Sequence, residues 1–282
     1  MEILSRIDKE SKFGFGLHVH HEQFTECDSM SKKTKMLFVQ NDNDYNMDRA
    51  RFRLYLTKCK EFMLKSISQE TAEYDQFASG GWLFVHGKWG LNCSDLRVCR
   101  MEDEIQLLKL HGCDGDFSFP AGRRHCDPYI KTPFTVIPAR GFRIYDYRPS
   151  AAKPIRSKSG AMKEDRFFIW SSKLEHPSSS LDAGPVALWS PSTGPADYLN
   201  SLLRKSVKIE DTLFIKTYAH SMEKRLEGVL KCPYPLSHPD VLKMFDTLET
   251  LCVKNNVELN YVTASEVYNI FKGIDDGTIK QD

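Results

Sequence analysis

The chain has 282 residues, 41% of them hydrophobic, and its 39 basic residues nearly balance 38 acidic ones. A length of this order fits one large domain or two small ones, and an α/β barrel of this size is ordinary. The net charge of +1 gives no indication of binding to nucleic acid or to an anionic membrane. No run of about 18 apolar residues is present, which excludes a transmembrane helix.

The N-terminus and the cysteines predict a cytoplasmic location. The first ten residues lack the apolar stretch of a secretory signal. Eight cysteines are scattered without a Cys-x-x-Cys pair, which is typical of reduced thiols and argues against a zinc knuckle.

The most informative segment is a short strand predicted over residues 15–21, with a glutamate directly after it. Alternate side chains of a strand share a face, so His18, His20 and Glu22 project to one side. Two imidazoles and a carboxylate form the start of a divalent-metal site, in which the carboxylate is a ligand or a general base. A solvated, histidine-rich strand edge is the alternative interpretation.

Strands and helices then alternate along the chain. Residues 36–40 predict a second strand, and residues 48–67 predict a helix with apolar side chains at helical spacing. A Gly-Gly step leads into a strand over 82–86. A helix over 101–110 and then a short strand over 116–119 are predicted after it. This alternation is typical of an α/β fold with a largely parallel sheet.

The composition changes between about residues 141 and 195, where Pro, Ser, Gly and charged residues accumulate. We interpret this segment as a polar insertion or a cap over the barrel mouth, with strand-like pieces at 142–147 and 166–170. Regular elements are predicted after it. One helix covers about 195–206, a second begins at Pro239, and a last one ends at Gly273. Strands are predicted at 212–218 and 257–262. A capping-box pattern begins the last helix at Thr263.

Three histidines follow predicted strands: His20, His86 and His220. In a parallel α/β fold the carboxyl ends of the strands meet at one edge, where binding and catalytic residues gather. We therefore expect these histidines to share a site, although a single histidine in such a place is more often structural.

Three further side chains are candidates for substrate binding. Arg123 and Arg124 follow a predicted strand end, and guanidinium groups suit carboxylate or phosphate recognition, with a solvated loop as the alternative. Trp89 lies three residues after His86. The sequence contains no G-x-S-x-G elbow, no P-loop and no G-x-G-x-x-G motif after a strand.

Several segments together resemble the polysaccharide deacetylases, carbohydrate esterases with a distorted (β/α) barrel. The divergent members found beside surface-polysaccharide biosynthesis genes are the most similar. The likeness covers residues 80–130 and 210–273. It is carried by Trp82–Gly87 (Trp-Leu-Phe-Val-His-Gly), Asp116–Arg123 (Asp-Phe-Ser-Phe-Pro-Ala-Gly-Arg), Leu213–His220 (Leu-Phe-Ile-Lys-Thr-Tyr-Ala-His), His238–Asp240 and Glu258–Tyr268.

The resemblance implies one deacetylase-like barrel domain over residues 1–282, with the 141–195 segment as its insertion. It implies that His86 binds a divalent metal, with zinc as the first choice. It also implies that His220 is the general acid that protonates the leaving amine. The Arg123 segment would line the active groove. The implied substrate is an N-acylated sugar of surface-polysaccharide biosynthesis, linked to a nucleotide or to a lipid.

The sequence departs from the family at two places. The family's first motif, Thr-Phe-Asp-Asp-Gly, supplies a base and a metal ligand and is absent here, and Gly90 stands where a second histidine ligand is expected. We hypothesise from strand geometry that His18 and His20 replace the missing ligands and that Glu22 replaces the aspartate base. The expected chemistry is then metal-assisted amide hydrolysis.

Two other interpretations stay open. A His-x-His pair on a first strand is also typical of amidohydrolases and histidinol-phosphatase-like barrels, which would use His18 and His20 in a different metal hydrolase. The missing Asp-Asp motif favours instead a catalytically inactive deacetylase-like domain that binds a glycan or a pathway partner.

Overall fold

The computed structural model describes residues 16–19, 49–67, 72–96, 99–119, 127–139, 152–158, 162–172, 186–187, 202–218 and 239–273. Residue contacts divide the chain into two compact units. The first joins Met1–Ser171 with Val262–Asp282, and the second is Ser172–Tyr261. Each unit is described by itself. The single barrel domain with a cap over 141–195 stays a prediction.

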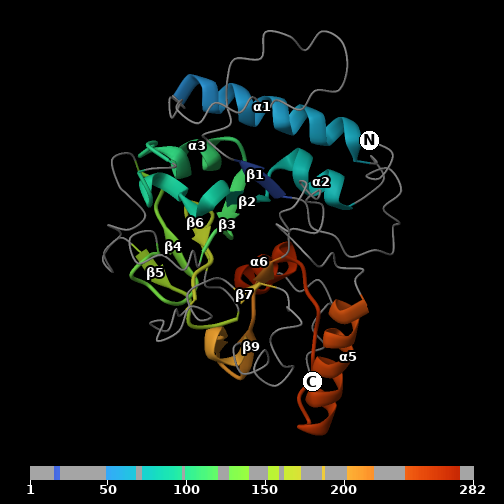
Figure 1. Ribbon diagram of the computed structural model, residues 1–282. Coiled ribbons are helices and arrows are strands. Elements are labelled where there is room, and N and C mark those ends of the chain that lie inside the picture. The colour runs from blue at the N-terminus through green and yellow to red at the C-terminus, as the bar shows by residue number, and fades with distance from the viewer. Residues whose placement is uncertain are drawn as a thin grey trace, which may run out of the picture. The chain divides into compact units, whose positions relative to one another are not determined.

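A six-stranded sheet forms the centre of the first unit (Figure 1). In spatial order its strands are β1 (Gly16–Val19), β2 (Trp82–His86), β3 (Cys113–Asp116), β6 (Phe167–Ile169), β4 (Phe134–Val136) and β5 (Ala152–Pro154). The first four run parallel, while β4 is antiparallel to both of its neighbours. The structure thus confirms a mixed α/β fold with a mostly parallel sheet. The barrel stays a prediction, because β1 and β5 end this order among the described strands.

Four helices belong to the same unit: α1 (Arg49–Ser66), α2 (Ala72–Ser79), α3 (Glu104–Leu110) and α6 (Ala264–Lys272). The sequence predicted α1, α3 and α6 in these places, and the strands at 82–86 and 166–170 are confirmed as well. The strand predicted over 116–119 was placed about three residues too late. The strand begins at Cys113, and Gly112 and Gly115 made it hard to predict because glycine is uncommon in strands.

One face of the sheet packs against α1 and α3. The strand register places Leu17, Phe84, Asp116 and Ile169 in one row on this face, and all four are buried. Phe52 and Leu56, one helical turn apart on α1, join them in the main hydrophobic core together with apolar side chains of α3. This face is apolar over most of its area. The buried polar residues His86 and Asp116, at the ends of β2 and β3, are therefore exceptions that need an explanation.

The opposite face packs against α6. Phe168 of β6 meets Tyr268 edge-on and stacks on Phe271, with ring centroids 5.8 and 5.9 Å apart. Thr263 and Glu266 form the predicted capping box, and Gly273 ends the helix with a φ of 78°. These contacts are hydrophobic and aromatic, so α6 serves packing.

Two glycines hold the beginnings of β2 and β3 close together. Gly80 and Gly112 have φ values of 99° and 84°, and a Cβ on Gly112 would lie only 2.9 Å from the Cα of Gly80. The amide of Gly81 donates a hydrogen bond of 2.7 Å to the carbonyl of Gly112. A side chain at Gly80 or Gly112 would be strained, and at Gly112 it would also push the two strands apart.

In the part of the second unit that the structure describes, there are two small strand pairs, one long helix and a helical segment over residues 202–205, within the helix predicted at about 195–206. Strands β7 (Val186–Ala187) and β10 (Thr217–Tyr218) run parallel, and β8 (Val207–Ile209) forms a hairpin with β9 (Thr212–Phe214). Helix α5 (Pro239–Lys254) begins at the predicted proline. The strand predicted over 212–218 is divided between β9 and β10.

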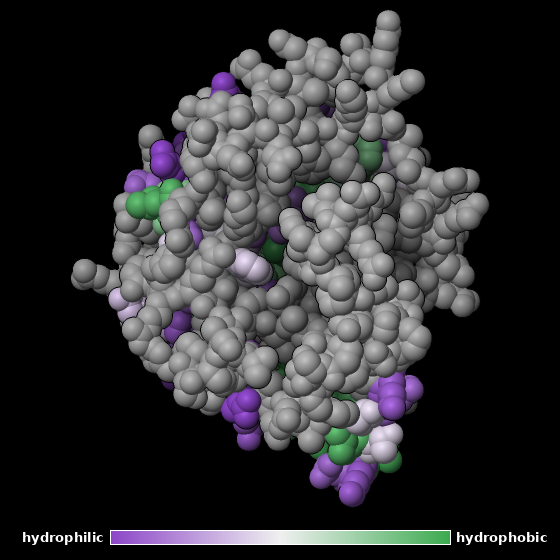
Figure 2. All heavy atoms as spheres, viewed as in Figure 1, coloured by the Kyte–Doolittle hydropathy of each residue, from purple (hydrophilic) through white to green (hydrophobic). Residues whose placement is uncertain are grey.

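The strand predicted over 257–262 was wrong. Residues 257–262 follow the end of α5 without regular structure and are mostly exposed. The apolar side chains of Val257 and Val262 are exposed here, as is that of Val253 in the last turn of α5. Hydrophobic and hydrophilic side chains lie next to one another at the lower right of Figure 2. Among the described helices, none combines the length and the hydrophobicity that crossing a membrane requires.

Candidate metal centre

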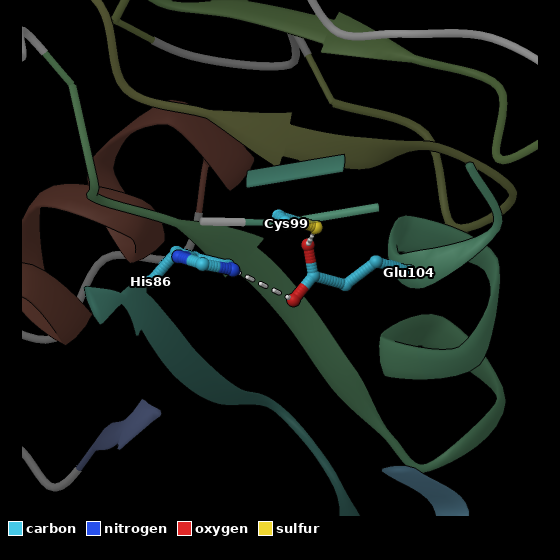
Figure 3. Close-up of side chains that lie close together, drawn as sticks. All are labelled: His86, Cys99 and Glu104. Atoms are coloured by element: carbon cyan, nitrogen blue, oxygen red, sulfur yellow. Dashed lines mark hydrogen bonds and ion pairs between the residues drawn. The ribbon is translucent and has the colours of Figure 1, made fainter. Parts of the chain in front are cut away.

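Three buried side chains of the first unit converge at the carboxyl end of β2: His86, Cys99 and Glu104 (Figure 3). His86 is the last residue of β2, and Glu104 is the first residue of α3. Their donor atoms, one from each residue, all lie within 4.8 Å of one another. An imidazole, a thiol and a carboxyl group in this arrangement could hold a metal ion.

The carboxylate of Glu104 is the centre of the cluster. His86 Nε2 lies 3.4 Å from Glu104 Oε1, and Cys99 Sγ donates to Oε2 over 3.4 Å. The side chains of His86 and Glu104 have no exposed surface. A charged group buried to this extent costs several kcal/mol unless opposite charges and hydrogen bonds compensate it. The cluster is therefore a deliberate feature of the core.

A strained turn also holds Glu104. The amide of Asn92 donates to Glu104 Oε2 over 2.6 Å, and the amide of Ile105 donates to the Asn92 side chain over 3.1 Å. Asn92 and Cys93 have φ values of 48° and 60°, which non-glycine residues seldom adopt. Strain of this kind persists where the surrounding structure fixes it, and it concentrates at functional sites.

The backbone around His86 is fixed to the neighbouring strand. Its amide donates to Ser118 Oγ over 2.7 Å, and that hydroxyl donates to Asp116 Oδ2 over 2.7 Å. Asp116, at the end of β3, is fully buried and also accepts from the Ser118 amide over 2.8 Å. Polar groups of β2 and β3 are thus linked at the carboxyl edge of the sheet, where α/β proteins carry their sites.

The second ring nitrogen of His86 faces the backbone. Its Nδ1 lies 2.5 Å from the carbonyl oxygen of Gly87 and 3.2 Å from the amide nitrogen of Gly90. A proton on Nδ1 is donated to Gly87, which leaves Nε2 free to bind a metal. With the proton on Nε2 instead, this N–H faces Glu104 Oε1 at 3.4 Å, and Nδ1 accepts from the Gly90 amide. The site can thus hold the histidine in either neutral tautomer.

Cys99 is a protonated thiol in this environment. Burial is the main cause that raises its pKa well above the usual value, and the neighbouring Cys93 side chain and Glu104 add to it. A metal ion binds the thiolate, so binding would displace this proton. Cys93 is buried beside it, and its amide donates to Cys99 Sγ over 3.5 Å.

The register of β1 does not bring His18 to His86. His18 is paired with Val85 and Val19 with His86, so the two histidines project to opposite faces of the sheet. His18 is exposed, and its Nδ1 lies 3.0 Å from the carbonyl oxygen of Val85. The predicted ligands His18, His20 and His86 stay a hypothesis, because His20 lies outside the described residues.

The other predicted site residues are placed as follows. Glu22, His220, Arg123 and Arg124 all lie outside the described residues, so their roles stay predictions. Trp89 is half-buried and packs against the hydrophobic core, and its carbonyl accepts a hydrogen bond of 3.2 Å from Ser94. Its substrate contact is likewise still a prediction.

Sequence reasoning missed Cys99 and Glu104. One signal could have found Glu104, because it falls on the same helical stripe as Leu107 and Leu108 and is therefore a carboxylate on an apolar face. Cys99 carries no such signal.

Comparison with known proteins gives no match: no protein-family model, no curated protein and no solved structure resembles the chain sufficiently.

Proposed function

We propose that the chain is a metal-dependent hydrolase that removes an acyl group from the nitrogen of a sugar. The metal centre of this proposal is the cluster of His86, Cys99 and Glu104. One observation carries it: His86 aims Nε2 at two further donor side chains while Nδ1 faces the Gly87 carbonyl at 2.5 Å. Metal-binding histidines usually donate their second N–H to a carbonyl or carboxylate, which fixes the ring. The hydrolytic reaction and the sugar substrate come from the resemblance to polysaccharide deacetylases.

The donor set fits zinc. Zinc ligands lie about 2.0–2.3 Å from the ion, so two ligand atoms of a tetrahedral site are separated by about 3.3–3.8 Å. Nε2 lies 3.4 Å from Oε1 and Sγ lies 3.4 Å from Oε2, while one donor atom from each residue lies within 4.8 Å of the others. A small movement of the side chains would therefore bring the three donors to this spacing. Three protein donors leave one position for water, as in catalytic zinc sites. When bound, such an ion lowers the pKa of water and polarises an acyl carbonyl.

The protein's own groups would prepare the site. The Gly87 carbonyl can accept a hydrogen bond from a protonated Nδ1 of His86, which is the tautomer that a metal on Nε2 requires, and the Asn92 amide holds the Glu104 carboxylate in place. Glu22 as the base and His220 as the acid that protonates the leaving nitrogen belong to the same proposal.

Complete burial of the cluster favours a second candidate function. A substrate must reach the metal of a hydrolase, yet the side chains of His86 and Glu104 have no exposed surface. A deacetylase-like domain without activity, in which the cluster binds a structural ion or acts as a buried ion pair, would have this property. It would bind a glycan or a protein partner through other residues.

Metal analysis and an activity assay together separate the candidates. The purified protein is analysed for metal by mass spectrometry and for acetate release from N-acetylated sugars. His86→Gln, Cys99→Ser and Glu104→Gln should each lose the metal, whereas Cys113→Ser, a buried thiol on β3, should retain it. Metal with acetate release supports the hydrolase, and metal without it supports the inactive domain. A folded protein that binds no zinc, cobalt or nickel contradicts the metal centre.

A further inference from the structure

Helix α1 presents a regular stripe of side chains to solvent, which we call the outer stripe. It consists of Arg51, Leu54, Lys58, Phe62 and Lys65. Steps of three and four residues keep these positions on one side of an α-helix. The buried side of α1 faces the core instead, and no residue of the outer stripe is buried. The stripe therefore has no role in packing this unit.

The charge of α1 is strongly one-sided. The helix contains six basic residues and one acidic residue, whereas the whole chain has a net charge of +1. Arg49 and Arg51 lie in the first turn, which has no acidic residue. Cations there oppose the helix dipole and reduce helix stability. Arg49 is paired with Asp103 and Lys58 with Glu61, and the other four basic residues leave the helix with an excess of positive charge although the protein is almost neutral.

Two large apolar side chains interrupt the cations. Leu54 is 61% exposed and Phe62 is 53% exposed, and Lys58 lies between them on the stripe. Each leaves apolar area in water that burial against a partner would remove. Basic side chains are attracted to anionic lipid headgroups, and exposed Leu and Phe side chains beside them can bury apolar area at the headgroup boundary.

We propose that the outer stripe of α1 binds the surface of an anionic membrane. Leu54 and Phe62 enter the boundary between headgroups and acyl chains, and Lys65 binds lipid phosphates. Lys58 exchanges its exposed ion pair with Glu61 for a lipid phosphate, because an exposed pair of this kind contributes little to stability. The helix length of 18 residues corresponds to about 27 Å of contact along the surface. A nucleic acid would pair its phosphates with the cations but would not bury the apolar side chains. The stripe therefore favours lipid. This inference goes beyond the proposed function and does not depend on the metal centre.

Vesicle sedimentation with the full chain tests the proposal. Binding to phosphatidylcholine vesicles that contain phosphatidylglycerol should exceed binding to phosphatidylcholine alone, and added salt should weaken it. Lys58→Gln with Lys65→Gln should weaken binding about fivefold for each lysine. Leu54→Ser with Phe62→Ser should weaken it as well. The matched control is Lys243→Gln with Lys254→Gln, two exposed lysines of α5.

Several outcomes would overturn the proposal. Equal binding to neutral and anionic vesicles, or none to either, would do so, as would an equal loss in the α5 control. Loss with the lysine pair but not with the Leu54 and Phe62 pair would assign the stripe to a general polyanion, which binding to single-stranded DNA would confirm. Circular dichroism verifies that each variant is folded.

Discussion

The two faces of the large sheet are built from different kinds of side chain. On the α1 and α3 face, His86, Glu104 and Asp116 are buried within an otherwise apolar core. On the α6 face, Phe168 packs against Tyr268 and Phe271, and the contacts are aromatic. Apolar packing dominates the α6 face, to which Tyr268 adds a hydrogen bond with the Asp114 side chain, whereas buried charges on the other face need precise partners. Polar groups retained at such cost mark the face where function is to be sought.

Among the single changes considered, removal of Glu104 should lower the free energy of unfolding most. Glu104→Ala leaves His86, the Cys99 thiol and the Asn92 amide without their shared carboxylate. The expected loss in the free energy of unfolding is about 3–5 kcal/mol, as for one partner of a buried ion pair. Urea denaturation measures it. The exposed Glu102, two residues earlier, provides the control Glu102→Ala, and an equal effect there would contradict the role of the cluster.

Metal removal should have the next largest effect. A chelator should lower the free energy of unfolding by about 2.7 kcal/mol if free metal was on the order of 100 times its Kd. Thermal unfolding with and without the chelator measures the change. His86→Gln should show no such difference. A chelator effect that persists in His86→Gln would place the ion elsewhere.

The α6 face should respond with stability alone. Phe271→Leu removes part of a fully buried ring, and we expect a loss of about 1.5 kcal/mol in unfolding free energy. The metal content should equal that of the wild type, because Phe271 lies on the face opposite to His86. Metal loss in a folded Phe271→Leu protein would show that the two faces are coupled.

The cap of α6 should give the smallest effect. Thr263 accepts from the amide of Glu266 over 3.2 Å, so Thr263→Ala should cost about 1 kcal/mol in unfolding free energy. Thr250 is exposed on α5, and its hydroxyl only donates to the Asp246 carbonyl. Thr250→Ala should therefore change stability by less than about 0.5 kcal/mol. Equal effects would mean that the capping box does not secure α6.

Local patterns predicted elements well and predicted the site poorly. The spacing of Phe52 and Leu56 indicated α1, and Thr263 with Glu266 marked the beginning of α6, because these signals lie within one or two helical turns. Glu258 and Asn260 suit a strand poorly, yet the valines beside them suggested one, and no neighbouring strand is there to pair with it among the described residues.

The metal cluster could be predicted only in part. His86 was identified because it ends an apolar run, which is a local signal. Its partners Cys99 and Glu104 come from a loop and a helix start whose position depends on how α3 packs against β2. The hypothesis that His18 shares a site with His86 assumed that both side chains project from the same face of the sheet. The face on which each side chain lies depends on the strand register, which the sequence does not show.

The order of synthesis adds a constraint through α6. This helix covers Phe168 but lies almost 100 residues later in the chain, after the whole second unit. As the ribosome makes the chain at about 5–20 residues per second, the aromatic face of β6 is translated several seconds before its cover. A nascent chain of this protein would expose that face to chaperones in the interval, so α6 can cover the finished sheet only after the whole second unit has been made.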